Sequence, residues 1–270
     1  MKKFKHKKSL GQNFLKNDSV ISDIVNSSDI TNEDIILEIG PGQGILTRAL
    51  SKKAGKVIAI ELDDRLIPVL ESEFESVDNI KIIHDDILKL NIEEFSKTQE
   101  LKHKTYKVIA NIPYYITAPI IRLFLESKNQ PSEIILMVQK EVAERLSANP
   151  GGMSLLAVSA QYYANVEYLF TVSREDFDPV PKVDSAIIKL TIKNNRLADD
   201  EIKEFFRVVK IGFSAKRKTL INNLANGFHL DKKDVENILF DLGFDKNIRA
   251  QELAIEDWQS LAKQEFNQIK

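Results

Sequence analysis

The 270-residue chain contains no cysteine, one tryptophan and four histidines. Without cysteine it can form no disulfide and use no thiol nucleophile, which fits a cytoplasmic protein. The histidines stand far apart in the sequence, at His6, His84, His103 and His229, and show no metal-ligand spacing. We therefore expect no metal site.

Long apolar runs are also missing. No run approaches the roughly 18 residues that a transmembrane helix needs, and the first residues form no long apolar segment. We expect neither a membrane span nor a signal peptide. With 43% hydrophobic and 29% charged residues, the chain has enough apolar material for one large domain and one small domain.

Basic and acidic residues nearly balance in total, but two segments contain basic residues and no acids. The formal net charge is −2, yet residues 1–16 carry six lysines and no acid: Lys2, Lys3, Lys5, Lys7, Lys8 and Lys16. A second basic run without acids contains Arg207, Lys210, Lys216, Arg217 and Lys218. Such patches can bind phosphates, although a solubilising tail and a solvated helix face would have the same composition.

Strand and helix patterns alternate through the first two thirds of the chain, which predicts a mostly parallel α/β sheet with helices on both faces. Strand-like apolar runs lie at 35–39, 57–60, 80–83, 108–110 and 134–138, with helical patterns at 45–53, 64–74 and 118–126. The runs 166–172 and 186–192 predict antiparallel strands that finish the sheet. From residue 199 only helical patterns remain, so we expect a domain of residues 1–194 followed by a small all-helical domain, 195–270.

A glycine-rich loop, Gly40-Pro41-Gly42-Gln43-Gly44, follows the first of these strands. Glycines at a strand-to-helix turn let the backbone approach a ligand closely. A dinucleotide fingerprint requires its third glycine three residues after the second, where this chain has Ile45. Pro41 also supplies no N–H donor for a pyrophosphate. The spacing therefore disfavours a dinucleotide.

Acidic residues accompany the ends of the first three strands: Glu38, Glu61 and Asp85-Asp86. The acid that ends the second strand is suited to ribose hydroxyls. Several carboxylates around one crevice would repel a pyrophosphate but would suit a cationic ligand with an amino acid tail. S-adenosylmethionine, a sulfonium that carries ribose and adenine, meets that description.

The segment Asn111-Ile112-Pro113-Tyr114 follows the apolar run that ends at Ala110. An adenine amino group is a poor nucleophile because its lone pair is delocalised into the ring. An enzyme that methylates it must accept hydrogen bonds from the amino group and hold the base flat. Asn111 Oδ1 and the Ile112 carbonyl can accept, and Tyr114 offers a stacking face.

Five segments together resemble the ribosomal RNA adenine N6-dimethyltransferases, and most closely the small-subunit (16S) enzymes. They are Ser9–Leu15, Leu37–Thr47, Asn111–Tyr114, Phe177–Ser185 and Phe213–Leu220. The resemblance implies a class I, Rossmann-like methyltransferase fold that binds S-adenosyl-L-methionine. The implied cofactor-binding residues are Asn13, Leu15, Gly40, Glu61, Asp86 and Asn111, and the implied catalytic residues are Asn111, Tyr114 and Phe177.

In that family Glu61 would bind the ribose hydroxyls and Asp86 the adenine of the cofactor, while Asn13 and Leu15 would fold over it. Phe177 would be a second stacking face for the target base. The implied substrate is two adjacent adenines in the 3′-terminal hairpin loop of 16S rRNA in the small ribosomal subunit. The implied protein is a cytoplasmic monomer with a role in subunit biogenesis.

Three alternatives stay open at this point. The first is a large-subunit adenine methyltransferase that confers macrolide resistance. It is suggested by Ile112, because small-subunit enzymes more often have leucine there and isoleucine is common in the large-subunit enzymes. A DNA adenine or protein glutamine methyltransferase would use a similar tetrapeptide, but would explain neither the N-terminal segment nor the basic run near Arg217. The third alternative is a mainly non-catalytic ribosome-assembly factor.

Overall fold

The computed structural model describes residues 13–194, 198–264 and 266. The chain forms two compact units, one of residues 1–143 and 164–192 and the other of residues 144–163 and 193–270. The basic cluster at residues 2–8 and the segment Ser9–Gln12 lie outside the described residues. No described helix is long and apolar enough to cross a membrane.

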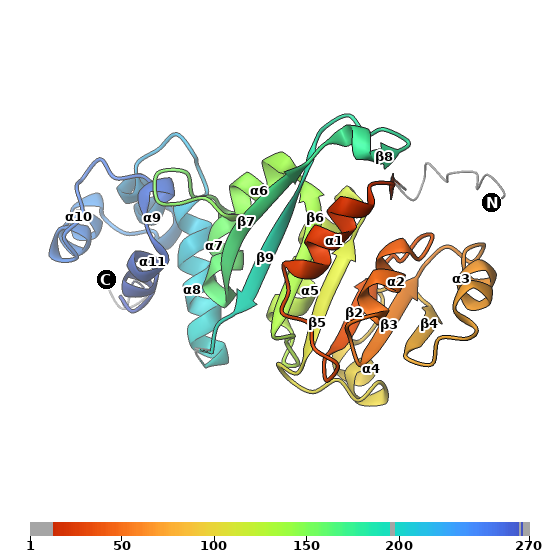
Figure 1. Ribbon diagram of the computed structural model, residues 1–270. Coiled ribbons are helices and arrows are strands. Elements are labelled where there is room, and N and C mark those ends of the chain that lie inside the picture. Colours follow the sequence, from red (N-terminus) through yellow and green to blue (C-terminus); the bar gives the residue numbers. More distant parts are fainter. Residues whose placement is uncertain (1–12, 195–197, 265, 267–270) are drawn as a thin grey trace. The chain divides into compact units, whose positions relative to one another are not determined.

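The first unit is built on a seven-stranded sheet, in which the strand order is β4-β3-β2-β5-β6-β9-β7 (Figure 1). The first five strands in this order are parallel, whereas β9 runs antiparallel to β6, and β7 antiparallel to β9. All seven strands predicted from the sequence are present. Their bounds are β2 (Ile35–Ile39), β3 (Lys56–Glu61), β4 (Ile80–His84), β5 (Tyr106–Asn111), β6 (Glu133–Gln139), β7 (Ala164–Val172) and β9 (Ser185–Ile192).

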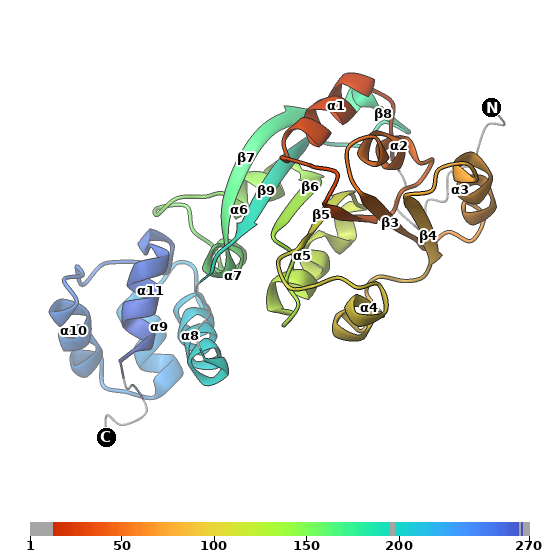
Figure 2. The same cartoon turned by 60° about the horizontal axis from the view of Figure 1, so that its bottom comes forward.

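Helices cover both faces of this sheet, as the alternating pattern predicted. Figure 2 shows α1 and α2 on one face and α4 and α5 on the other. The apolar side of α1 carries Val20, Ile21, Ile24 and Val25, all buried in the main core. The bounds are α1 (Asp18–Asn26), α2 (Ile45–Ser51), α3 (Ile67–Phe74), α4 (Ile92–Thr98) and α5 (Thr117–Glu126).

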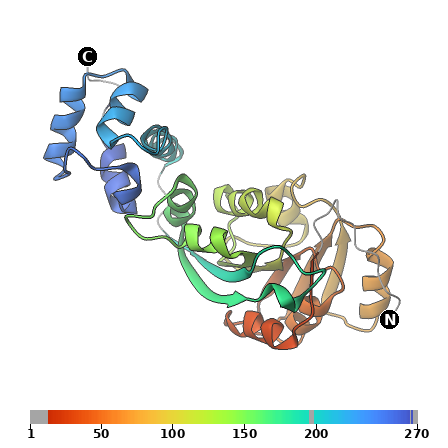
Figure 3. The ribbon, with the colours of Figure 1, turned by 90° about the horizontal axis from the view of Figure 1, so that it is seen from above.

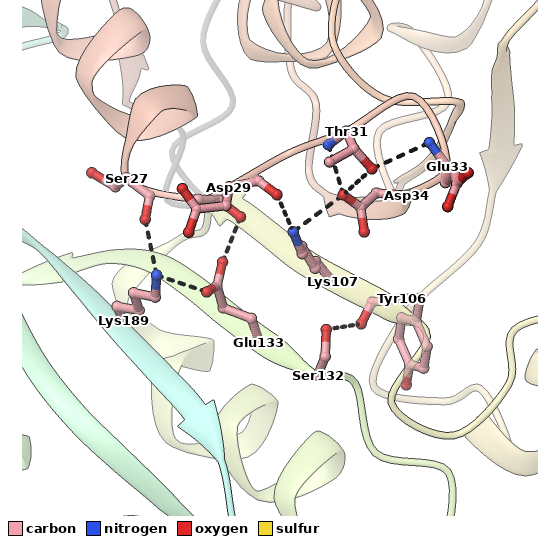
Figure 4. Close-up of polar contacts among 11 residues, drawn as sticks. Ser27, Asp29, Thr31, Glu33, Asp34, Tyr106, Lys107, Ser132, Glu133 and Lys189 are labelled. Carbon is pink, nitrogen blue, oxygen red and sulfur yellow. Dashed lines mark hydrogen bonds and ion pairs between the residues drawn. The ribbon is translucent and has the colours of Figure 1, made fainter.

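A polar network fixes the segment between α1 and β2 to the edge of the sheet where the parallel strands begin (Figure 4). Lys107 Nζ donates to the Asp29 carbonyl at 2.7 Å and pairs with Asp34 at 3.2 Å. Lys189 pairs with Glu133 at 2.8 Å, and Ser28 Oγ donates to the same carboxylate at 2.5 Å. The network thus holds α1 in place from the edge opposite to the glycine loop.

A separate two-stranded sheet joins distant parts of the first unit. Strand β1 (Phe14–Leu15) pairs antiparallel with β8 (Phe177–Asp178), so that Leu15 lies opposite Phe177. Two contacts extend this pairing, since Lys16 N donates to the Asp176 carbonyl at 2.8 Å and Asn17 Nδ2 donates to Asp176 Oδ1 at 2.9 Å. These strands have only two residues each, and the sequence analysis did not predict them.

The second unit consists of helices, drawn from green to blue in Figure 3. It includes α7 (Leu155–Tyr163), α8 (Asp199–Gly212), α9 (Leu220–Phe228), α10 (Lys232–Asp241) and α11 (Ile255–Ala262), while α6 (Lys140–Leu146) spans the division. The sequence predicted one boundary after residue 194, whereas residues 144–163 also belong to this unit. The reason is aromatic packing, because Tyr162 and Tyr163 of α7 contact Phe205 and Phe206 of α8.

Candidate active site

A cavity of about 250 Å³ lies at the carboxyl ends of the parallel strands of the first unit. Ligands of open α/β sheets bind at this edge, where the loops after successive strands meet. Its walls come from the ends of β2, β3 and β5, the segment after β4, strand β1, the start of α2, and Phe177 of β8.

Every site residue predicted from the sequence lines this cavity. The set comprises Asn13, Leu15, Gly40, Glu61, Asp86, Asn111, Tyr114 and Phe177. They come from six separate segments, so the fold brings together residues that are far apart in the sequence. The role of each one remains a prediction.

Glu61 ends β3, and backbone N–H groups hold its carboxylate. Gly42 N donates to Oε2 at 3.1 Å and Asp63 N donates to Oε1 at 2.8 Å. Burial raises the pKa of this carboxyl, while the two N–H donors oppose the increase. Glu61 therefore links the end of β3 to the glycine loop and leaves an acceptor at the cavity wall for a ribose hydroxyl.

Glu38 is the penultimate residue of β2, near the strand end as predicted, and it is almost fully buried. Its Oε2 atom has no hydrogen-bond partner among the residues that the structure describes. Burial raises its pKa to about 8; the Thr47 hydroxyl lowers it and the Glu61 carboxylate adds to the increase. A buried carboxyl oxygen at a cavity wall that has no hydrogen-bond partner fits a bound group that carries positive charge or an N–H donor.

The glycine loop leaves open space beside this carboxyl. Gly40 has a φ of +67°, and a Cβ built there would have no atom within 4 Å. Gly42 has a φ of +58°, and a Cβ there would lie 2.8 Å from the Phe14 ring. A residue with a side chain at position 40 would project into the cavity, whereas one at position 42 would displace the wall of β1. Both positions therefore require glycine for a ligand to lie against the backbone.

The segment after β4 contributes Asp86 and an apolar surface. Asp86 Oδ1 accepts from Leu88 N at 3.1 Å, and its carboxylate pairs with Lys89 at 3.3 Å. Leu62 and Leu88 line the cavity and are 44% and 40% exposed, and the buried Ile87 also lines it. The sequence analysis missed these apolar residues, although all three lie within two residues of an acid that it selected at a strand end. Together they form a surface suited to a flat aromatic ring.

The opposite wall carries the tetrapeptide. Asn111 ends β5, Ile112 is buried, and Pro113 has the extended ψ of 135° that directs the chain into the short 3₁₀ helix η2 (Tyr114–Ile116). The Tyr114 hydroxyl bonds Ser185 Oγ at 2.8 Å. Burial raises the pKa of Tyr114, so its phenol stays neutral at ordinary pH. The arrangement offers acceptors at Asn111 and Ile112 beside one ring face.

Phe177 supplies the second aromatic ring and is buried at the cavity wall through its position in β8. Among the described residues there is no group of three or more His, Asp or Glu side chains that could hold a metal ion. The cavity thus combines an acidic side, suited to a cationic cofactor with ribose, and a side with amide acceptors and aromatic rings. This is the chemistry needed to methylate an amino group on a flat base.

Comparisons with known proteins agree with this geometry. Residues 3–266 match the family of ribosomal RNA adenine dimethylases. The ribosomal RNA small subunit methyltransferases A of Dehalococcoides mccartyi and Bacillus thuringiensis are 40% and 42% identical to this chain. The alignments cover 95% and 96% of this chain and 87% and 91% of those proteins.

Two solved structures are also similar. A dimethyladenosine transferase from Plasmodium falciparum has a TM-score of 0.76 and 30% identity, over 92% of this chain and 95% of that one. The 23S rRNA methyltransferase ErmE has a TM-score of 0.75 and 26% identity, over 93% and 98%. With a family match over nearly its whole length, the chain belongs to the ribosomal RNA adenine dimethylase family.

Proposed function

We propose that the chain dimethylates the N6 amino groups of two adjacent adenines in the 3′-terminal hairpin loop of 16S rRNA within the small ribosomal subunit, with S-adenosylmethionine as methyl donor. One observation carries the proposal: a single cavity is lined by the glycine loop, by Glu38 and Glu61, and by Asn111 and Tyr114. The small-subunit assignment draws on the names of the relatives that are 40–42% identical.

The acidic side of the cavity holds the cofactor. Glu61 accepts hydrogen bonds from the ribose hydroxyls, and Asp86 accepts from the amino group of the cofactor adenine. Asn13 and Leu15 cover the ligand from the β1 side, and Gly40 lets it lie against the backbone. The cofactor supplies an electrophilic methyl group on a sulfonium.

The other side holds the target adenine. Asn111 Oδ1 and the Ile112 carbonyl accept hydrogen bonds from its amino group, and Tyr114 and Phe177 hold the ring. The new C–N bond would form as the methyl–sulfur bond of the bound cofactor breaks, and the amino proton, which is acidic only at that stage, would pass to water, so the site requires no general base. Catalysis depends on positioning and on acceptors directed at the developing positive charge. A loop adenine is easily extruded because little base pairing must be broken.

We assign catalysis to the first unit and ribosome binding to the helical unit, which contains residues 195–270. The support for the second assignment is the loop between α8 and α9, where Lys216, Arg217 and Lys218 are exposed. Arginine and lysine at such a loop can bind RNA phosphates. We further propose that the chain acts as a cytoplasmic monomer during subunit biogenesis.

Two other functions have specific support. The similarity to the 23S rRNA methyltransferase and Ile112 favour a large-subunit substrate. A mainly non-catalytic role in ribosome assembly would use the same basic loop without the aromatic cavity. The cavity therefore favours an enzyme, and the near-full-length relatives favour the small subunit.

Radiolabelled methyl transfer tests the proposal directly. Unmethylated small subunits, unmethylated large subunits and naked 16S rRNA are incubated in parallel with the purified chain and labelled S-adenosylmethionine. We expect label in the small subunits. Label in the large subunits alone would establish the macrolide-resistance activity, and label in neither would leave the assembly role.

A further inference from the structure

We propose that Ser185 is a positioning residue that fixes the ring of Tyr114 through the hydrogen bond between their side chains. The bond joins Tyr114 Oη to Ser185 Oγ at 2.8 Å. The inference rests on the proposed function, because it assigns Tyr114 to the target base. Ser185 does not line the cavity, so it acts only through Tyr114.

The position of Ser185 makes it a rigid anchor. It is fully buried and begins β9, where it lies opposite Gln139 of β6 on one side and Val172 of β7 on the other. The preceding residue is held as well, since Asp184 accepts from Lys140 N and from Arg174 N, both at 3.0 Å. The Ser185 hydroxyl therefore projects from backbone that hydrogen bonds secure on both sides.

Tyr114 is held less firmly by its own segment. Its helix η2 has only three residues, and Ile116 N donates to the Pro113 carbonyl at 3.1 Å across it. A tyrosine ring on so short a helix can still rotate about its side-chain bonds. The tie to Ser185 removes that freedom before the base arrives, and such preorganisation lowers the barrier to a reaction that depends on orientation.

The hydrogen bond to Ser185 can be removed without removing the stacking face of the Tyr114 ring. A phenylalanine at position 114 keeps the stacking face but cannot bond Ser185, and an alanine at position 185 leaves Tyr114 intact but unanchored. Both changes should lower kcat for small-subunit methylation by about three- to tenfold, the value of one net hydrogen bond. KM should change little because the stacking surface is retained.

A double-mutant comparison tests the tie with Tyr114→Phe, Ser185→Ala and the combined variant. Since all three lack the same bond, we expect equal kcat losses, with no further loss in the combination. Tyr106→Phe and Ser132→Ala are matched controls. Tyr106 donates to the Asn129 carbonyl and Ser132 to the Tyr106 carbonyl, at the edge of the sheet opposite the cavity. They should leave kcat unchanged.

A second measurement does not depend on activity. The protein has six tyrosines, and in tyrosine-labelled full-length protein the NMR signal missing from Tyr114→Phe identifies Tyr114. That signal should shift in Ser185→Ala more than the other five. Any of three results would overturn the proposal. They are a kcat decrease in the combined variant equal to the product of the two single decreases, an unchanged kcat in Ser185→Ala, and an unshifted Tyr114 NMR signal in Ser185→Ala. A wild-type protein inactive on small subunits would instead contradict the proposed function.

Discussion

Leu15 and Phe177 lie opposite each other in the short sheet of β1 and β8. The strand that places Leu15 at one wall of the cavity therefore also supports the strand that places the Phe177 ring at another. Asp176 secures this pairing, since its carbonyl accepts from Lys16 N and its carboxylate from Asn17 Nδ2.

Asp176→Ala should weaken cofactor binding although Asp176 does not line the cavity. The loss of one side-chain hydrogen bond, ~0.5–1.5 kcal/mol, should lower the affinity for S-adenosylmethionine about two- to tenfold by loosening β1. Calorimetric titration with S-adenosylmethionine measures this affinity. Glu175→Ala is the matched control, because the exposed Glu175 carboxylate pairs with its sequence neighbour Arg174 and not with β1. Equal affinities in the two variants would show that the pairing does not support the cofactor side.

Replacing Glu61 should reduce cofactor affinity much more. Removing the charged hydrogen-bond partner of the ribose should cost ~1.5–3 kcal/mol of binding free energy, which corresponds to a roughly 10- to 150-fold increase in Kd. Glu61→Gln keeps one acceptor oxygen, enough for the Asp63 or the Gly42 N–H group but not for both, and should lose less affinity than Glu61→Ala. Glu73→Ala, which removes an exposed acid paired with Arg48, should bind normally. Unchanged calorimetric affinity in Glu61→Ala would remove Glu61 from the cofactor site.

Glu38 should make the stability of the ligand-free protein depend on pH. Its pKa is raised from 4.5 to about 8, so between these values the folded state holds a proton that the unfolded state releases. The free energy of unfolding should therefore fall as pH rises from about 4.5 to 8. Glu38→Gln lacks this effect.

The difference in Tm between Glu38→Gln and wild type should thus grow from pH 5 to pH 8.5, by about 2–4 °C for each kcal/mol gained. Thermal denaturation followed by circular dichroism gives both values, and the contribution of Glu61 largely cancels in the difference. A difference that stays constant with pH would mean that Glu38 is ionised throughout.

The basic loop between α8 and α9 should carry RNA affinity. Lys216, Arg217 and Lys218 are exposed there, and each phosphate that they neutralise releases counterions, so log K falls with log salt. Arg217→Ala with Lys218→Ala should flatten this slope by about one unit for each phosphate that is no longer neutralised. The matched pair Lys232→Ala with Lys233→Ala, also exposed in the helical unit, should leave the slope unchanged.

Small-subunit binding across a salt series provides the measurement, and cofactor titration shows whether the catalytic unit is intact. If slope and affinity stay at wild-type values in the Arg217 and Lys218 variant, the ribosome binds the protein elsewhere. The cluster at residues 2–8 would then be the next surface to neutralise.

The central strands β2, β3, β5 and β6 could be predicted because they are nearly continuous apolar runs, typical of strands buried on both faces. The sequence did not predict β1 and β8, since two residues define no period and only pairing between distant segments creates these strands. The sequence analysis did not predict α1, although the sequence has a helix-start pattern there: Asn17 caps the helix, and apolar residues that are buried follow at 20, 21, 24 and 25. The basic residues near Arg217 lie in a loop, not on a helix face.

Glu61, Asp86, Asn111 and Tyr114 could be selected because their types suit the ligand chemistry and the strand ends converge, whereas Asn13, Leu15 and Phe177 came only from the family resemblance. The sequence could not reveal that Glu38 Oε2 has no hydrogen-bond partner among the described residues, since that depends on burial, nor that Ser185 bonds Tyr114, since that depends on how β9 pairs. The apolar residues Leu62 and Leu88 were missed for a simpler reason. A leucine in sequence is usually core, and only the folded chain leaves these two exposed at a cavity.

Identification of the nucleoside formed by wild type and by Asn111→Ala tests the proposed reaction most directly. Unmethylated small subunits are incubated with S-adenosylmethionine, and their RNA is digested and analysed by mass spectrometry. We expect N6,N6-dimethyladenosine from two adjacent positions of 16S rRNA with wild type. With Asn111→Ala we expect almost none, because the amino group loses its acceptor, while the variant stays folded by circular dichroism. Absence of the dimethylated nucleoside with wild type, or near-wild-type turnover by Asn111→Ala, would contradict the proposed chemistry.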